Sequence, residues 1–119
     1  MITKGAIYLA NLGTKAQNDI GKIRPVCIFQ NRMLNRAIDT GAYQEAIIIP
    51  LSTQLLGGDY RLKIAKRERL EHDSELFCNG LRMISVERIF FAQGALTQLT
   101  PLEIKAVEQI LYDLLGCSL

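Results

Sequence analysis

Short apolar runs separated by turn-forming residues make up most of the chain. The runs are rich in Ile, Val, Leu and aromatic residues, which favour β-strands. They cover residues 5–12, 25–30, 46–51, 60–65 and 80–84, with short pieces at 76–78 and 90–91. Between them lie segments with glycine or many charges, which favour turns. This pattern restricts the chain to a mainly β fold, either a small barrel or a curled sheet.

Two of the runs contain proline, which cannot donate a hydrogen bond to a neighbouring strand. Residues 46–51 form the most hydrophobic run and are expected to be the central strand, with a bulge or the strand exit at Pro50. Pro25 is expected at the first position of its strand, where the missing N–H costs nothing. In residues 60–65 apolar and basic residues alternate, which predicts a half-exposed strand.

Three polar segments connect the predicted strands. Residues 13–24 are polar with two glycines and predict a long exposed loop. Residues 31–44 are mixed, end in a glycine-containing turn and predict a second loop. Residues 66–75 are highly charged and predict a turn.

The C-terminal residues predict one amphipathic helix. Thr100, Pro101 and Glu103 have the order of an N-cap hydroxyl, an N1 proline and the acidic residue of a capping box, and Gly116 provides a stop. Apolar residues recur between them at helical spacing and are expected to pack on the sheet. They are Ile104, Val107, Leu111 and Leu114, widened by Ile110 and Leu115.

Length and composition describe one small domain. The 119 residues, 49% hydrophobic and 22% charged, are enough for a core and exclude a disordered or disulfide-built chain. No apolar run approaches the roughly 20 residues of a membrane span, and no secretion signal opens the chain. The three cysteines have no CxxC spacing. We therefore expect one domain over residues 1–119, in the cytoplasm and with reduced thiols.

The charge is distributed unevenly, although its total is only +2. Residues 1–88 carry 13 basic and 9 acidic side chains, and residues 89–119 carry 1 and 3. A positive body with a negative tail allows a local phosphate-binding face, and charges that only solvate the surface explain the pattern equally well.

Several kinds of catalytic site are excluded by the residues. There is no glycine-rich phosphate loop, and the single histidine, His72, cannot form a His–His acid–base pair. Residues 71–75 contain the side chains of a triad, but sequence neighbours cannot adopt its geometry, so we interpret them as a solvated turn. Cys27 lies inside an apolar run and is interpreted as a core residue. We expect neither a metal nor a cofactor.

Two strand ends remain as candidate sites. Lys22 and Arg24 precede a buried strand, and residues 52–54, Ser-Thr-Gln, follow the most hydrophobic one. Arginine offers a permanent charge and a fork of donors that matches phosphate oxygens, and hydroxyl and amide groups can bind the same anion. The residues alone predict an anion site here, with an ordinary strand-end arginine as the open alternative.

Several segments together resemble the MazF/PemK-type toxins of type II toxin–antitoxin systems. The similar segments run in the family's order through nearly the whole chain: residues 4–12, 18–26, 29–31, 48–54, 69–74 and 81–84, and the Leu-Thr-Pro-x-Glu opening of the last helix. The resemblance implies an SH3-like barrel of the CcdB/MazF/PemK type with a C-terminal helix. It also implies a homodimer, a MazE-like antitoxin that covers the RNA groove, and contact with operator DNA only through that antitoxin.

The same resemblance implies a metal-independent, sequence-selective endoribonuclease acting on single-stranded messenger RNA. Arg24 matches the catalytic arginine of the family's Arg-Pro motif, Ser52 matches its hydroxyl partner, and Asp19 matches an acidic loop residue. The 2′-OH of the RNA would attack the phosphorus, with a 2′,3′-cyclic phosphate and a 5′-OH as products. Further contacts with RNA are expected from Lys15, Lys22, Thr53, Gln54, Lys63, Asn79 and Arg82.

One strand departs from the family pattern and leaves other functions open. Where the family has Asp/Glu-Gln-x-Arg-Thr-Ile-Asp, residues 79–85 read Asn-Gly-Leu-Arg-Met-Ile-Ser. One alternative is a weak or inactive toxin-fold protein that binds an antitoxin–operator complex or inhibits a target such as gyrase. Another is an SH3-like interaction module with no toxin role.

Overall fold

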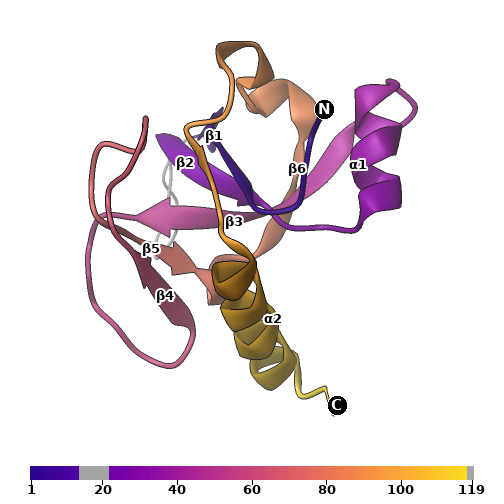
Figure 1. The fold of residues 1–119 in the computed structure, drawn as a ribbon. Coiled ribbons are helices and arrows are strands. Elements are labelled where there is room, and N and C mark those ends of the chain that lie inside the picture. Colours follow the sequence, from indigo (N-terminus) through magenta and orange to yellow (C-terminus); the bar gives the residue numbers. More distant parts are fainter. Residues whose placement is uncertain (14–21, 118–119) are drawn as a thin grey trace.

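The computed structural model describes residues 1–13 and 22–117 (Figure 1). A mostly antiparallel half-barrel carries a helix at its C-terminal end, which confirms the predicted fold class. The strands are β1 (Ala6–Asn11), β2 (Ile23–Ile28), β3 (Glu45–Ser52), β4 (Arg61–Ile64), β5 (Ser74–Phe77), β6 (Arg82–Ser85) and β7 (Thr97–Gln98). The helices are α1 (Arg32–Asp39) and α2 (Pro101–Leu115), with 3-10 turns η1 (Cys78–Gly80), η2 (Val86–Arg88) and η3 (Phe91–Gln93).

Strand β3 is central, as predicted. The order across the sheet is β4-β5-β3-β2-β1-β7, and β6 also pairs with β3. On the edge away from β2, β3 pairs with β6 up to Ile48 and with β5 from Leu51. Pro50 lies between these two ladders, so neither needs its missing N–H. The predicted exit at Pro50 is wrong, since β3 continues to Ser52.

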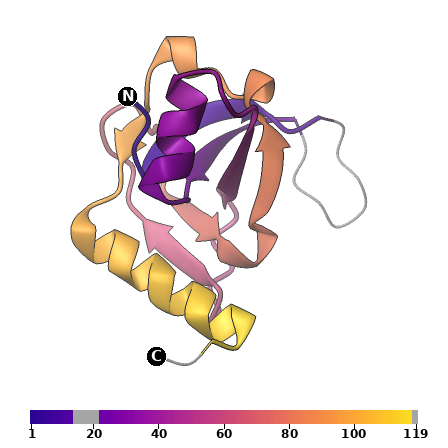
Figure 2. The same ribbon diagram turned by 90° about the vertical axis from the view of Figure 1, so that its right-hand side faces the viewer.

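The sheet buries side chains on both faces because successive residues of a strand point to opposite sides. One core contains Cys27 and Ile49, and the residues of α2 pack against it. The other contains Val26 and Ile48, and Ile38 of α1 packs against it. Figure 2 shows the two helices on different sides of the sheet.

Helix α2 follows its sequence prediction closely. The Thr100 hydroxyl accepts a hydrogen bond from the Glu103 N–H, the Glu103 carboxylate accepts one from the Thr100 N–H, and Gly116 ends the helix at φ 72°. Val107 is fully buried, and Ile104, Ile110 and Leu111 pack against the core. Leu115 does not belong to this stripe, since it is 68% exposed.

The predicted loop over residues 31–44 is wrong in part, because it contains helix α1. Asn31 caps the helix by accepting a hydrogen bond from the Leu34 N–H at 2.9 Å. Its one buried residue is polar, Asn35, which bonds Gln30. Its apolar residues Leu34, Ala37 and Ile38 do recur at helical spacing, but they span only two turns and are half-buried, a short signal that the prediction missed.

Two other boundaries differ from the prediction. β2 begins at Ile23, so Pro25 is its third residue, at a position where only β1 is paired with it. The charged turn ends at Asp73, and Ser74 and Glu75 are buried residues of β5.

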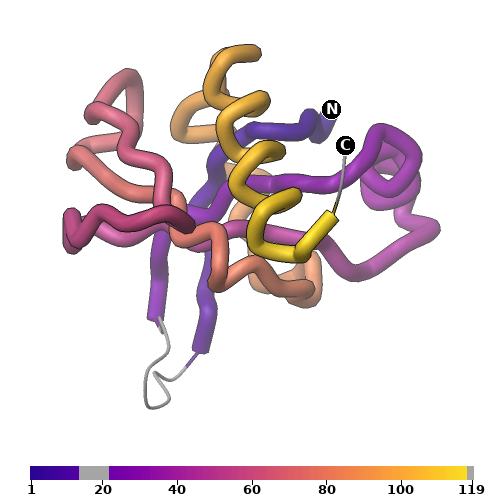
Figure 3. The backbone as a smooth tube through the Cα atoms, turned by 90° about the horizontal axis from the view of Figure 1, so that it is seen from below, coloured from indigo at the N-terminus to yellow at the C-terminus, as the bar shows by residue number. Residues whose placement is uncertain are grey.

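Figure 3 shows the paired ends of β1 and β2 extending beyond the rest of the fold. Within the described residues, no helix is long and apolar enough to cross a membrane.

Candidate functional site

Arg24 lies where β2 leaves its pairing with β3. It is paired with Ala10 of β1, but the ladder between β2 and β3 begins only at Val26 and Pro50. The side chain is half-buried, and its Nε is buried with no hydrogen-bond partner among residues 1–13 and 22–117. None of the ion pairs within the described residues involves Arg24. A desolvated guanidinium donor without a partner is costly unless a ligand completes it.

Ser52 ends β3 on the same side of the sheet as Arg24. Two positions beyond the Val26–Pro50 pair, the antiparallel register would bring Arg24 and Ser52 opposite each other, but the β2–β3 ladder ends at that pair. On its other edge, β3 is still paired there with β5. The Ser52 hydroxyl accepts a hydrogen bond from the Gln54 N–H at 3.1 Å. Because neighbouring residues alternate, Thr53 follows on the other side.

A buried carboxylate holds the segment that follows Ser52. Glu75, the cross-strand partner of Ser52, is 4% exposed and accepts hydrogen bonds from the N–H groups of Leu56 and Gly57, each at 3.0 Å. Arg61 donates to both Glu75 and the Gln54 carbonyl at 3.2 Å. Burial raises the pKa of Glu75, but the bonds from Gly57, Arg61 and Leu56 outweigh it, so the net pKa is lowered. Glu75 is thus a fixed anion that positions residues 52–57.

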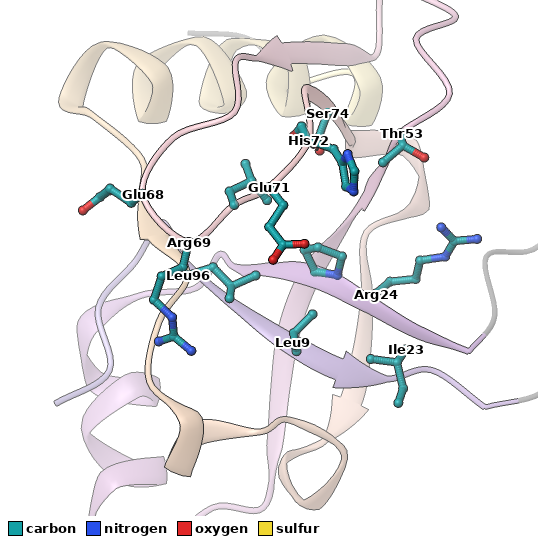
Figure 4. Close-up of a pocket in the computed structure, with 12 residues that line it drawn as sticks. Leu9, Ile23, Arg24, Thr53, Glu68, Arg69, Glu71, His72, Ser74 and Leu96 are labelled. Carbon is teal, nitrogen blue, oxygen red and sulfur yellow. Dashed lines mark hydrogen bonds between the residues drawn. The ribbon is translucent and has the colours of Figure 1, made fainter.

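On the other side, Arg24 and Thr53 line a pocket of about 610 Å³ (Figure 4). Its floor is apolar and its rim polar, an arrangement typical of ligand sites. The floor is formed by Leu9, Ile23, Pro25, Leu70 and Leu96. The polar lining residues are Arg24, Thr53, Glu68, Arg69, Glu71, His72 and Ser74.

The wall that carries Glu71 and His72 is held in place at both ends. Arg67 forms two hydrogen bonds with Glu103 of α2, at 2.6 and 2.8 Å, and these lower the pKa of Glu103. Arg69 donates to the carbonyls of residues 93 and 95, and the Ser74 hydroxyl donates to the His72 carbonyl at 2.9 Å. These bonds fix the position of this wall of the pocket.

The structure brings some of the predicted site residues together. Arg24 and Thr53 share the pocket, whereas Ser52, the residue before Thr53, is not one of its lining residues. Lys63 and Asn79 are exposed and are not pocket residues, nor is Gln54. Arg82 on β6 pairs with Ile48 of β3. Lys22 is exposed just before β2 and has a positive φ of 65°. The predicted residues Asp19 and Lys15 lie outside the described residues.

Sequence reasoning missed the acidic residues and histidine near Arg24. Residues 71–75 are not simply a solvated turn, because Glu71 and His72 line the pocket and Glu75 is buried. Leu76 and Phe77 gave only a weak sequence signal for β5. The two residues before them, Ser74 and Glu75, are polar and yet buried. Cys27 is a core residue as predicted, and burial is the main cause that raises its pKa. Among the described residues no three metal-ligating side chains gather.

Comparison with known proteins gives one family over almost the whole chain. The family model described as "PemK-like, MazF-like toxin of type II toxin-antitoxin system" matches residues 3–115. The fold is similar to that of the Mycobacterium tuberculosis toxin MazF-mt6, with a TM-score of 0.75, 15% identity, and 96% of this chain and 99% of the other covered.

Two further solved structures share the fold. One is an endoribonuclease in complex with its cognate antitoxin from a mycobacterial species, with a TM-score of 0.75, 15% identity, and 100% and 99% coverage. Another is MazF from Deinococcus radiodurans, with a TM-score of 0.71, 16% identity, and 95% and 94% coverage.

Proposed function

Because the chain belongs to the PemK-like and MazF-like toxins of type II toxin–antitoxin systems, we propose that it is an endoribonuclease that cleaves single-stranded messenger RNA. A cognate MazE-like antitoxin holds it inactive, and the toxin contacts operator DNA only through that antitoxin. The active form is a homodimer. One solved structure of the same fold is described as an endoribonuclease with its cognate antitoxin, which supports this assignment.

The substrate supplies its own nucleophile. The 2′-OH of one nucleotide attacks the adjacent phosphorus, the bond to the 5′ oxygen breaks, and the products are a 2′,3′-cyclic phosphate and a 5′-OH. The protein must accept the 2′ proton, stabilise charge on the phosphate oxygens and protonate the leaving oxygen. None of these tasks requires a metal, so cleavage is proposed to be metal-independent.

Arg24 is the proposed phosphate-binding group, and its buried Nε without a partner is the observation that carries this proposal. A phosphate oxygen would complete that donor, and the charge would oppose the negative charge that develops on the phosphorane. Arg24 is also proposed to deliver the proton to the 5′ oxygen.

Ser52 and Asp19 complete the proposed site. The Ser52 hydroxyl accepts from the Gln54 N–H, so its own proton is free to be donated to a non-bridging phosphate oxygen. Asp19 is assigned from the family resemblance, either to orient Arg24 or to accept the 2′ proton. The RNA strand is proposed to reach Lys22, Lys63 and Arg82 as well.

The test compares wild type with Arg24→Ala on a long RNA in EDTA, with chemical analysis of the 3′ ends. We expect the wild type to leave cyclic phosphates and Arg24→Ala to be slower by about 10²–10³-fold, as for loss of one charge-stabilising donor. Arg36→Ala, an exposed arginine on α1, is the matched control and should cleave normally. Equal cleavage by wild type and Arg24→Ala would contradict the role of Arg24.

One observation favours a second candidate function, a toxin-fold protein that binds its antitoxin but does not cleave RNA. A Cβ at Gly80 would lie 2.6 Å from the Phe77 ring, and Arg61 stacks on that ring at 4.7 Å. The ring therefore leaves no room for the glutamine that the family pattern has at this position. Failure of the wild type to cleave RNAs that cover all base triplets, with antitoxin binding retained, would establish this second function.

A further inference from the structure

The pocket beside Arg24 contains polar groups that nothing in the described part of the chain engages. The Thr53 hydroxyl, the Glu71 carboxylate and the His72 ring line it, and no hydrogen bond or ion pair to another described residue uses these atoms. Figure 4 shows Thr53 and His72 on the same side of the pocket as the Arg24 side chain, with Glu71 nearer its centre. Open polar groups above an apolar floor point to a ligand with flat apolar faces and a polar edge.

We propose that this pocket binds a nucleobase that carries an exocyclic amino group, next to the phosphate held by Arg24. This inference rests on the proposed function. A base matches the pocket because its faces would lie against Leu9, Leu70 and Leu96 while its edge meets the polar rim. The volume of about 610 Å³ lies within the range of small-molecule sites.

Glu71 gives the pocket its preference. A carboxylate only accepts hydrogen bonds, so it pairs with the amino groups of adenine, cytosine or guanine. Uracil has no amino group, and its one N–H donor on that edge lies between two carbonyl oxygens that a carboxylate repels. The other charged groups that line the pocket are Glu68, Arg24 and Arg69. Arg69 is held by the carbonyls of residues 93 and 95, and Glu68 bonds the Thr97 hydroxyl. Glu71 is therefore the carboxylate of this lining with neither oxygen bonded to a described residue.

The end of β3 separates the two parts of the proposed nucleotide site. Ser52 and Thr53 point to opposite sides of the sheet, and only Thr53 lines the pocket. Arg24 lies on the Ser52 side by its register and is also one of the residues that line the pocket. The RNA backbone would cross this strand end, with a phosphate at Arg24 and Ser52 and the base in the pocket.

The first experiment uses 3′-CMP and 3′-UMP as probes, because the two differ only at the edge of the base. Each is titrated into the full chain, and backbone amide shifts are followed by NMR. We expect shifts at Leu9, Leu70 and Leu96 and roughly tenfold tighter binding of 3′-CMP, the size of one good base-edge contact. Glu71→Gln should remove most of that difference, because an amide can both donate and accept.

Glu87→Gln, an exposed glutamate on η2 outside the pocket, is the matched control and should leave both affinities unchanged. Equal affinities for the two nucleotides in the wild type, or shifts away from the pocket, would overturn the proposal. A preference for 3′-CMP that survives in Glu71→Gln would overturn the role of Glu71.

The second experiment separates this proposal from the proposed function. Wild type and Glu71→Gln are compared on a pool of RNAs, and the cut sites are sequenced. We expect one position of the cut site to favour A, C or G over U in the wild type and to lose that bias in Glu71→Gln. Cleavage with an unchanged bias would overturn the base pocket and leave the nuclease intact. No cleavage by the wild type would overturn the proposed nuclease function. The nucleotide titration would then decide by itself whether the pocket binds a base.

Discussion

The two ends of the β2–β3 pair differ in whether their buried polar side chains have hydrogen-bond partners. Just beyond one end, Gln30 is 6% exposed and fully engaged: its amide donates to Asn35 at 2.9 Å and its oxygen accepts from the Ile47 N–H at 2.9 Å. At the other end, Arg24 has a buried donor with no partner, and Thr53 reaches into a pocket. Buried polar groups that stabilise a fold bond one another, whereas groups kept for a ligand are left open. Under the proposed function, this difference separates a structural end of the pair from a functional one.

The largest expected effect lies at the structural end. Gln30→Leu leaves the Ile47 N–H and the Asn35 side-chain oxygen buried without partners, and each orphaned group costs about 1–3 kcal/mol. We expect urea unfolding to show a loss of about 2–6 kcal/mol in the free energy of unfolding. Met33→Ala, an exposed residue of α1, is the control and should be neutral. A loss below about 0.5 kcal/mol for Gln30→Leu would remove the basis of the comparison.

The next effect concerns the segment after Ser52. Glu75→Ala removes the acceptor of the Leu56 and Gly57 N–H groups, so both amides should exchange faster with deuterium. Cleavage should fall by up to roughly 100-fold in kcat with little change in KM, because Ser52 and Thr53 lose their positioning. Glu75→Gln should recover part of the rate. Unchanged exchange at Leu56 and Gly57 would contradict the positioning role.

A pH effect is expected from the pocket wall. The hydrogen bonds from Arg67 hold the pKa of Glu103 below its usual value, so the pair stabilises the fold above the unfolded pKa of about 4.3. That contribution is lost as the pH falls from about 4.3 through the lower folded pKa. Glu103→Gln should therefore be less stable than wild type at pH 7, with a smaller fall in stability between pH 5 and pH 2. Parallel curves for the two proteins would exclude this contribution.

The smallest effect is expected at Lys63. This side chain is exposed on β4, outside the pocket, so Lys63→Ala should leave the free energy of unfolding within about 0.5 kcal/mol of wild type. If it contacts an RNA phosphate, binding should weaken alike for all sequences and the slope of log affinity against log salt should fall by about one. An unchanged slope would remove Lys63 from the proposed RNA contacts.

The elements that could be predicted from the sequence are those with strong local signals. The capping residues of α2 and the apolar runs of β1, β2 and β3 depend on nearby residues alone. Helix α1 was missed although Asn31 is a suitable N-cap and Leu34 and Ile38 have helical spacing, because the signal covers only eight residues. The burial of its polar residue Asn35 against Gln30 depends on the tertiary fold and could not be predicted.

Some residues of the candidate site could likewise be predicted from the sequence and others could not. Arg24 and Ser52 could be singled out because they stand at the ends of apolar runs. Glu71 and Glu75 look alike in a charged segment, yet one lines a pocket and the other is buried beneath the segment that follows Ser52. That difference comes from the pairing of β5 with β3 and β4, which sequence spacing does not reveal.

The most direct test measures unfolding in urea and RNA cleavage in EDTA for wild type, Arg24→Ala and Gln30→Leu under the same conditions. If the two ends of the β2–β3 pair divide structure from function, Arg24→Ala keeps the stability of the wild type and loses about 10²–10³-fold in cleavage rate. Gln30→Leu loses stability and, at temperatures where it is folded, cleaves like the wild type. Wild-type cleavage by Arg24→Ala, or a loss of its stability as large as that of Gln30→Leu, would contradict the account.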